Sequence, residues 1–73
     1  MLTIDQSQYI DDKTGRTIVR FTPVLHTDCC ASGELRFACW EVWADDSIQV
    51  QTDACKLAMQ NAREVLKRYS DES

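Results

Sequence analysis

The residues of this 73-residue chain best suited to bind a metal are its four cysteines and its single histidine. His26 and Cys29 have the spacing of a zinc loop, Cys30 follows directly, and Cys39 could fold back toward them. A structural zinc site needs four nitrogen or sulfur ligands, which zinc fingers typically supply as two closely spaced pairs. The chain has no second pair of this kind. A zinc site formed by His26, Cys29, Cys30 and Cys39 is therefore the alternative interpretation.

The favoured interpretation treats Cys39 and Cys55 as small buried side chains, because free cysteine is among the most buried residue types. We expect Cys39 on a strand to face Cys55 on a helix across the core. Cys29 and Cys30 are neighbours in a loop, where at least one thiol is exposed. Thiol catalysis would need a base such as His26 and a third residue to orient it, and the sequence identifies no such residue. We therefore predict that the protein is not an enzyme and binds no cofactor.

The segment 35–44 contains both tryptophans and is apolar on both faces of the strand that it predicts. Trp40 and Trp43 are three residues apart, so a regular strand points them to opposite faces. We assign to the core face Leu35, Phe37, Cys39 and Trp43. Trp40 and Val42 are then expected on the open face, because so short a chain can cover only one. An exposed aromatic patch of this kind predicts a binding surface for another protein.

Carboxylates surround this predicted patch. They are Glu41, Asp45, Asp46 and Asp53. Acidic residues outnumber basic ones by 12 to 8, which gives a net charge of −4. An acidic rim favours a basic surface on a protein partner and argues against a direct grip on nucleic acid, which carries the same charge. The alternative, contact with phosphates, would use the basic residues of the C-terminal helix, which are Lys56, Arg63, Lys67 and Arg68.

The length of the chain predicts one domain. At this size folding buries only about 60% of the surface of the unfolded chain, so stability is marginal without disulfides, a metal or oligomerisation. We therefore expect a homo-oligomer, most simply a dimer, that associates through the open sheet face or a helix seam. The sequence has no run of 18 apolar residues and no signal peptide, which predicts a cytoplasmic protein with no membrane partner.

The order of predicted elements is three strands followed by one helix. The strands are expected at about 2–10, 16–25 and 34–44, with a turn at 11–15 and with Pro23 at an edge, a bulge or a strand end. The helix is expected at about 53–69, with Thr52 or Asp53 as its cap. A short fourth strand at 47–51 would precede it. Alternatively, a helix capped by Asp46 begins near residue 47 and carries a seam that starts at Ile48. Either pattern predicts an α+β fold, in which one C-terminal helix packs on one face of an antiparallel sheet of three or four strands.

Together these patterns predict a small, acidic, non-enzymatic protein-binding module. Its size and charge are similar in kind to those of accessory or inhibitor proteins of phages and mobile elements. We expect it to dock on a basic site of a larger nucleic-acid-handling complex. A zinc- or nucleic-acid-binding regulator is the alternative.

Overall fold

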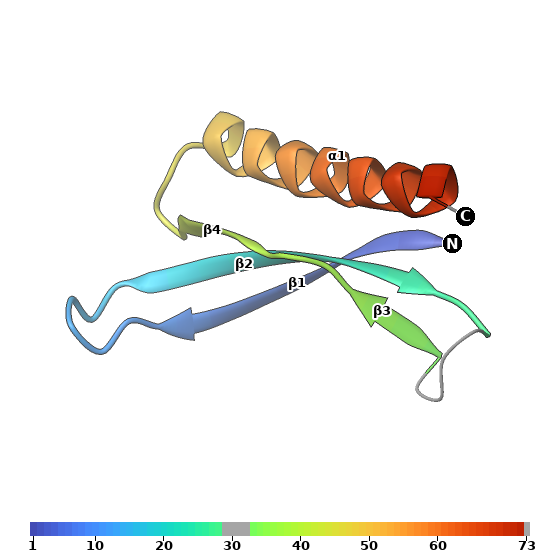
Figure 1. The fold of residues 1–73 in the computed structure, drawn as a ribbon. Helices are drawn as coiled ribbons and strands as arrows, with labels where there is room; N and C mark the ends of the chain where they lie inside the picture. Colours follow the sequence, from blue (N-terminus) through green and yellow to red (C-terminus); the bar gives the residue numbers. More distant parts are fainter. Residues whose placement is uncertain (29–32, 73) are drawn as a thin grey trace.

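The computed structural model describes residues 1–28 and 33–72, which form an α+β fold, as predicted. Four strands form one antiparallel sheet, and one helix covers one of its faces (Figure 1). In chain order the elements are β1 (Leu2–Ile10), β2 (Thr17–His26), β3 (Glu34–Arg36), β4 (Trp40–Trp43) and α1 (Ile48–Glu72). No helix in this described part of the chain is long and apolar enough to cross a membrane.

Strands β1 and β2 form a long hairpin whose register runs from Leu2 opposite Leu25 to Ile10 opposite Thr17. The bounds agree with the predicted strands to within one residue. The turn between them is held by two backbone bonds. Gly15 donates its N–H to the carbonyl of Asp11 at 2.7 Å, and Asp11 donates its own to the carbonyl of Arg16 at 2.9 Å. Gly15 has a φ of 71°, a conformation that a residue without a Cβ adopts at no steric cost.

Strands β3 and β4 follow one another along the other edge of β2, and they are not continuous. Arg36 lies opposite Val24, and Trp40 lies opposite Phe21. Trp40 is four residues after Arg36, but Phe21 is only three residues from Val24 along β2. One extra residue is therefore inserted between β3 and β4, as in a β-bulge. The insertion lies beside Pro23, which has no N–H to donate and instead accepts the N–H of Phe37 at 3.0 Å. The prediction of one strand over 34–44 was wrong at this point.

The extra residue reverses which side chains of this edge face the helix. Trp40 and Val42 lie opposite Phe21 and Val19 and pack against the core beneath the helix. Trp43 lies opposite Ile18, on the other face. The predicted faces of Trp40, Val42 and Trp43 were therefore wrong, because the prediction assumed regular alternation through the whole segment.

The prediction that Cys39 lies in the core opposite Cys55 was also wrong. Cys39 is exposed, and Cys55 is half-buried on the helix. Cys39 falls within the interruption between β3 and β4, where the ladder no longer fixes which way a side chain points.

The helix begins at Ile48, so the favoured start near residue 53 was wrong and the longer helix is the one that forms. Ser47 caps it: its side-chain oxygen accepts the N–H of Val50 at 3.3 Å, and its carbonyl accepts the N–H of Gln51 at 3.1 Å. Asp46, the expected cap of this longer helix, instead accepts the backbone N–H of Trp43 at 2.9 Å. Asp46 thus closes the turn that leads into the helix.

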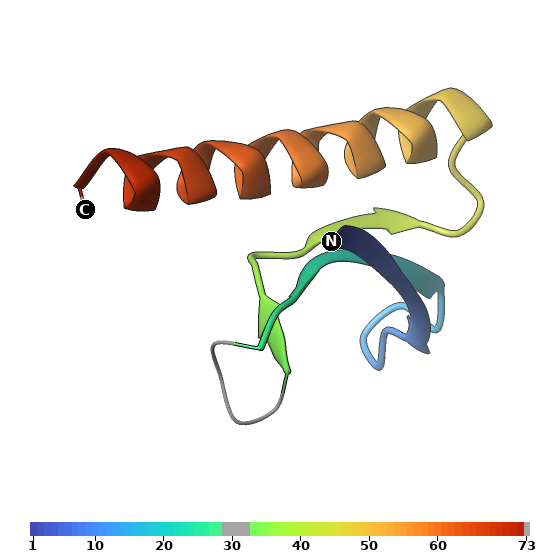
Figure 2. The ribbon, with the colours of Figure 1, turned by 90° about the vertical axis from the view of Figure 1, so that its right-hand side faces the viewer.

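The core lies between the helix and the central strand. Val19 and Phe21 of β2 meet Ala54 and Ala58 of α1, and Ala62, one turn further, is also buried. Alanines four residues apart line one face of a helix. Their short side chains let the helix backbone approach the sheet closely. Figure 2 shows the resulting two layers, with the helix lying above the sheet.

Candidate functional site

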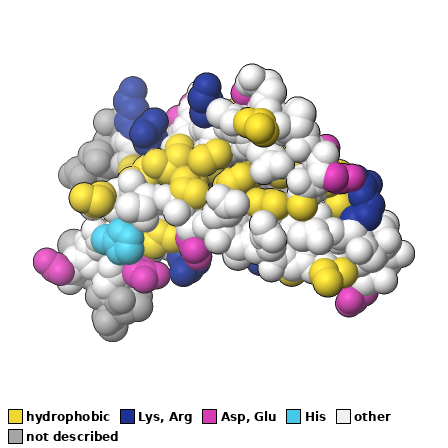
Figure 3. All heavy atoms as spheres, turned by 180° about the vertical axis from the view of Figure 1, so that it is seen from behind, with side chains coloured by type: hydrophobic (Ala, Val, Ile, Leu, Met, Phe, Trp, Pro, Cys, Tyr) yellow, Lys and Arg dark blue, Asp and Glu magenta, His cyan; other side chains and the backbone are white. Residues whose placement is uncertain are grey.

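A groove runs between the helix and the sheet, on the side of the helix that faces β1. Its volume is about 700 Å³, and it is lined by Phe21, Ile48, Gln51, Thr52, Cys55, Lys56, Met59, Gln60 and Arg63. Ile48 stands at one end with 84% of its surface exposed. Seen from behind, apolar side chains gather in a band between the helix and the sheet (Figure 3). The groove is an apolar surface that another molecule can reach.

The groove exists because one helix does not cover the whole width of the sheet. The helix packs mainly on β2 and β4, and from β1 Ile4 packs against the core beneath the helix. Gln6 and Gln8 of β1 lie opposite Phe21 and Val19, so they share the helix side of the sheet with these core residues. Both glutamines are exposed. The apolar floor at Phe21 therefore continues into a polar margin along β1.

The charge around the groove is positive. Lys56 and Arg63 are seven residues apart on α1, which places them two turns apart along the same side of the helix. No carboxylate is among the residues that line the groove. A ligand that matches this surface has apolar side chains for the floor and negative charge for the helix side.

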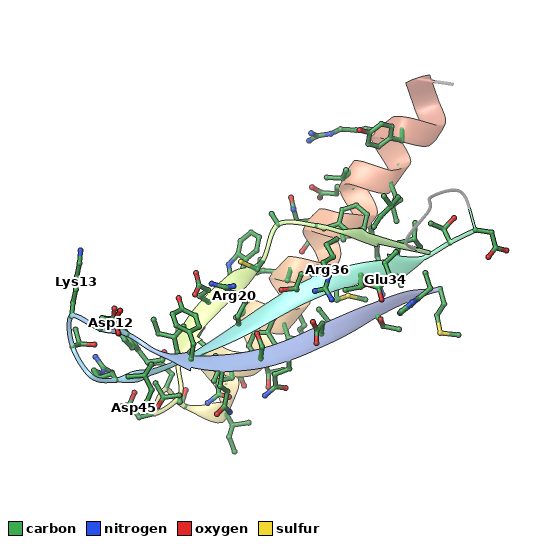
Figure 4. The ribbon with its side chains drawn as sticks, turned by 90° about the horizontal axis from the view of Figure 1, so that it is seen from below. Asp12, Lys13, Arg20, Glu34, Arg36 and Asp45 are labelled. Atoms are coloured by element: carbon green, nitrogen blue, oxygen red, sulfur yellow. The ribbon has the colours of Figure 1, made fainter. Side chains whose placement is uncertain are left out.

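The open face of the sheet, opposite the helix, has a different character. Its three arginines are each paired with a carboxylate from another segment: Arg16 with Asp45 at 2.9 Å, Arg20 with Glu41 at 3.5 Å and Arg36 with Asp5 at 3.0 Å. Arg36 also reaches Glu34 at 3.6 Å. Figure 4 labels Arg20, Arg36 and Glu34 over the exposed strands of this face. Each arginine thus has a negative partner, and the face as a whole is not basic.

Two aromatic rings of this face lie beneath arginines. The guanidinium of Arg16 is 4.0 Å from the centre of the Trp43 ring, and that of Arg20 is 4.9 Å from the centre of the Tyr9 ring. Such cation–π contacts contribute about 0.5–1 kcal/mol each at exposed sites. Trp43 is the tryptophan of the open face, but Arg16 covers it.

Hydrogen bonds shift the pKa values of Tyr9 and Asp45 on this face. The Tyr9 hydroxyl donates to the Glu41 carboxylate, and this bond raises the pKa of Tyr9 above its ordinary value. The hydrogen bond from Arg16 lowers the pKa of Asp45. Both groups keep their usual charge at neutral pH. The shifts therefore reflect structural pairing on this face.

The structure does not gather the predicted acidic residues into a rim. Glu41 and Asp45 lie in the ion pairs of the open face, and Asp46 closes the turn before the helix. Asp53 lies on the helix and accepts a hydrogen bond from the side chain of Gln49 at 2.9 Å. Trp40 and Val42, the expected centre of the patch, pack against the core. The predicted binding residues therefore do not form one surface.

The residues of the alternative zinc site lie apart in the described chain. His26 contacts the hydroxyl of Thr3 at 3.1 Å, and Cys39 is exposed in the interruption between β3 and β4. Residues 1–28 and 33–72 contain no group of three metal-ligating side chains. Cys29 and Cys30 lie outside the described residues, so their part in the zinc site stays a prediction.

The sequence contains one signal for the groove, the alternation of four- and three-residue steps from Ile48 through Thr52, Cys55 and Met59. This seam was predicted only with the longer helix. The contribution of Phe21 has no such signal, because strand alternation alone does not show where the helix leaves a strand uncovered.

Searches of family models, curated proteins and solved structures found no match to this chain.

Proposed function

We propose that this chain is a non-enzymatic protein-binding module that holds an apolar segment of a larger protein in the groove between α1 and the sheet. The observation that carries the proposal is the apolar lining itself, in which Phe21 and Met59 line the groove and Ile48 stands exposed at its end. Large exposed apolar surfaces on small soluble proteins typically mark interaction sites. The positive helix side, with Lys56 and Arg63, favours a segment that also carries carboxylates.

The groove supports protein binding better than nucleic-acid binding. A phosphate backbone is held by several basic side chains that are free to contact it. Here the arginines of the open face are paired with carboxylates, and the groove brings only Lys56 and Arg63 beside an apolar floor.

A basic partner surface, as expected from the net charge, stays a prediction. It would have to compete with Arg16 and Arg20 for the carboxylates of Asp45 and Glu41. Binding in the groove breaks none of these ion pairs, and we therefore propose the groove as the binding site. The cytoplasm as location, and a nucleic-acid-handling complex as the target that the module inhibits or regulates, likewise stay predictions.

A peptide-display selection against the immobilised protein tests the proposal. We expect selected peptides to combine apolar and acidic residues and to lose at least tenfold in affinity when Met59→Glu places a charge in the groove. Leu57→Glu is the matched control, because Leu57 lies on the same helix, is 47% exposed and does not line the groove. Peptides that bind both variants equally well, or that are mainly basic, would show that the groove is not the binding site.

A further inference from the structure

The outer edge of β1 carries backbone groups that no described strand pairs. Met1 and His26 form a bonded pair: the N–H of His26 donates to the Met1 carbonyl at 2.9 Å, and the Met1 amino group donates to the His26 carbonyl at 3.3 Å. At the other end of the hairpin, the N–H of Asp11, another odd-numbered residue, donates to the carbonyl of Arg16. In an antiparallel pair such bonded positions alternate along the strand, so the odd residues of β1 direct their N–H and C=O groups toward β2. The even residues direct theirs outward. These are Leu2, Ile4, Gln6, Gln8 and Ile10.

This edge has few of the features that prevent strands from pairing with other chains. Exposed edges are usually protected by proline, lysine, a bulge or a covering segment. β1 contains nine residues, neither proline nor lysine, and an unbroken register with β2. Its one charged residue, Asp5, is paired with Arg36 on the open face.

The isolated chain also exposes more surface than its mass predicts. A folded monomer of this mass exposes about 4,600 Å² according to the usual scaling. The structure exposes 5350 Å², and its radius of gyration is 14.1 Å, against about 11 Å for a compact domain of this length. The excess of about 700 Å² is close to the roughly 800 Å² that each partner buries in a stable complex of standard size.

We propose that β1 pairs antiparallel with β1 of a second copy, across a two-fold axis through Gln6, to give one continuous sheet. This is the register in which all nine residues of β1 have a partner. Ile10, which is 66% exposed in the single chain, then lies beside Leu2 of the second copy on the helix side. Asp5 lies opposite Ser7 of the second copy, so the register places no like charges face to face.

The dimer leaves the grooves open. Each helix packs mainly on β2 and β4, and the two-fold axis keeps both helices and their grooves on the same side of the joined sheet, with the paired β1 strands between them. The proposal is therefore independent of what the groove binds. A dimer would present two binding sites on one face.

Sedimentation equilibrium at micromolar concentration tests the proposal, and we expect twice the 8.4 kDa mass of the chain. Gln6→Glu and Gln6→Lys each place like charges opposite one another at the axis. We expect each variant alone to sediment as a monomer with unchanged circular dichroism. An equimolar mixture of the two should recover the dimer, because opposite charges then meet at the same position.

Gln8→Pro gives a second test, because it removes an outward N–H and leaves the ladder to β2 intact. We expect it to weaken the dimer at least tenfold, while the control Gln8→Ala leaves the dimer unchanged. The proposal would be overturned if the wild-type protein sediments as a monomer. It would also be overturned if Gln6→Glu, Gln6→Lys and Gln8→Pro each remain dimers. Met59→Glu separates the two proposals, since it should weaken peptide binding at least tenfold without changing the sedimenting mass.

Discussion

Trp40 lies directly opposite Phe21 across the β2–β4 ladder, and both side chains lie on the helix side of the sheet. Trp43, three residues further along, lies on the opposite face under the guanidinium of Arg16. The two tryptophans therefore have different roles, one in the core and the other in the polar face. This difference carries the first prediction.

Trp40→Ala should destabilise the protein much more than Trp43→Ala. Removing a core aromatic side chain typically costs about 3–5 kcal/mol, because buried contacts are lost and a cavity remains. Both rings are half-buried, but Trp43 lies on the polar face and not against the core. Trp43→Ala removes one cation–π contact there, and we expect a smaller loss of about 1 kcal/mol. Urea denaturation followed by circular dichroism measures both. Equal losses would mean that both rings are core residues and that the assigned faces are wrong.

Deleting Ala38, which is exposed, should leave the faces of β4 unchanged. The deletion removes the extra residue between β3 and β4, so three residues from Arg36 to Trp40 match three from Val24 to Phe21, and a continuous strand still places Trp40 opposite Phe21. We therefore expect the deletion variant to keep cooperative thermal unfolding. The control Ala38→Gly keeps the residue count and should also retain a cooperative transition. Loss of the transition in the deletion variant alone would show that the inserted residue is needed to set the faces.

Ser47→Ala should lower the free energy of unfolding by about 1 kcal/mol, because it removes the cap at the start of α1. Thr52→Ala, at the alternative cap position, lies inside the helix, where alanine is favourable, and should cause no loss. Thermal or urea unfolding distinguishes the two variants. The opposite ranking would place the helix start near residue 53 after all.

Glu41→Gln should lower the pKa of Tyr9. The hydrogen bond to Glu41 favours the neutral phenol, so the folded-state pKa is above the unfolded value of about 10. The stability from this bond is therefore present below the unfolded pKa and is lost as the pH rises through the folded one. Ultraviolet titration of phenolate measures the shift, with Tyr69→Phe in the background to remove the other tyrosine. A Tyr9 titration that Glu41→Gln leaves unchanged would contradict the pairing.

The hairpin of β1 and β2 was predictable because its signals are local. Asp11 and Gly15 define the turn, and β-branched residues such as Ile18 and Val19 favour an extended chain on one side of it. The helix start was not predicted correctly, because Ile48 and Val50 have low helix propensity. Propensities differ by less than about 1 kcal/mol per residue, and here the cap at Ser47 lies before both residues.

The candidate site was harder to predict than the fold. A single inserted residue between β3 and β4 exchanged the faces of Trp40 and Trp43, and alternation counted along the sequence has no signal for an insertion. The acidic residues Glu41 and Asp45 looked available because their arginine partners are 21 and 29 residues away in the chain. Such partners are known only once the strand register is known.

The alanine stripe of the helix has a consequence for how relatives of this protein could be found. At positions 54, 58 and 62 the helix lies so close to the sheet that a longer side chain would force the two layers apart. Mutation can change the surrounding surface freely, but at these positions we expect only glycine, alanine or serine to be accepted. A small residue at every fourth position over two turns, following a strand hairpin and a serine cap, should therefore persist in diverged homologues after overall identity is lost.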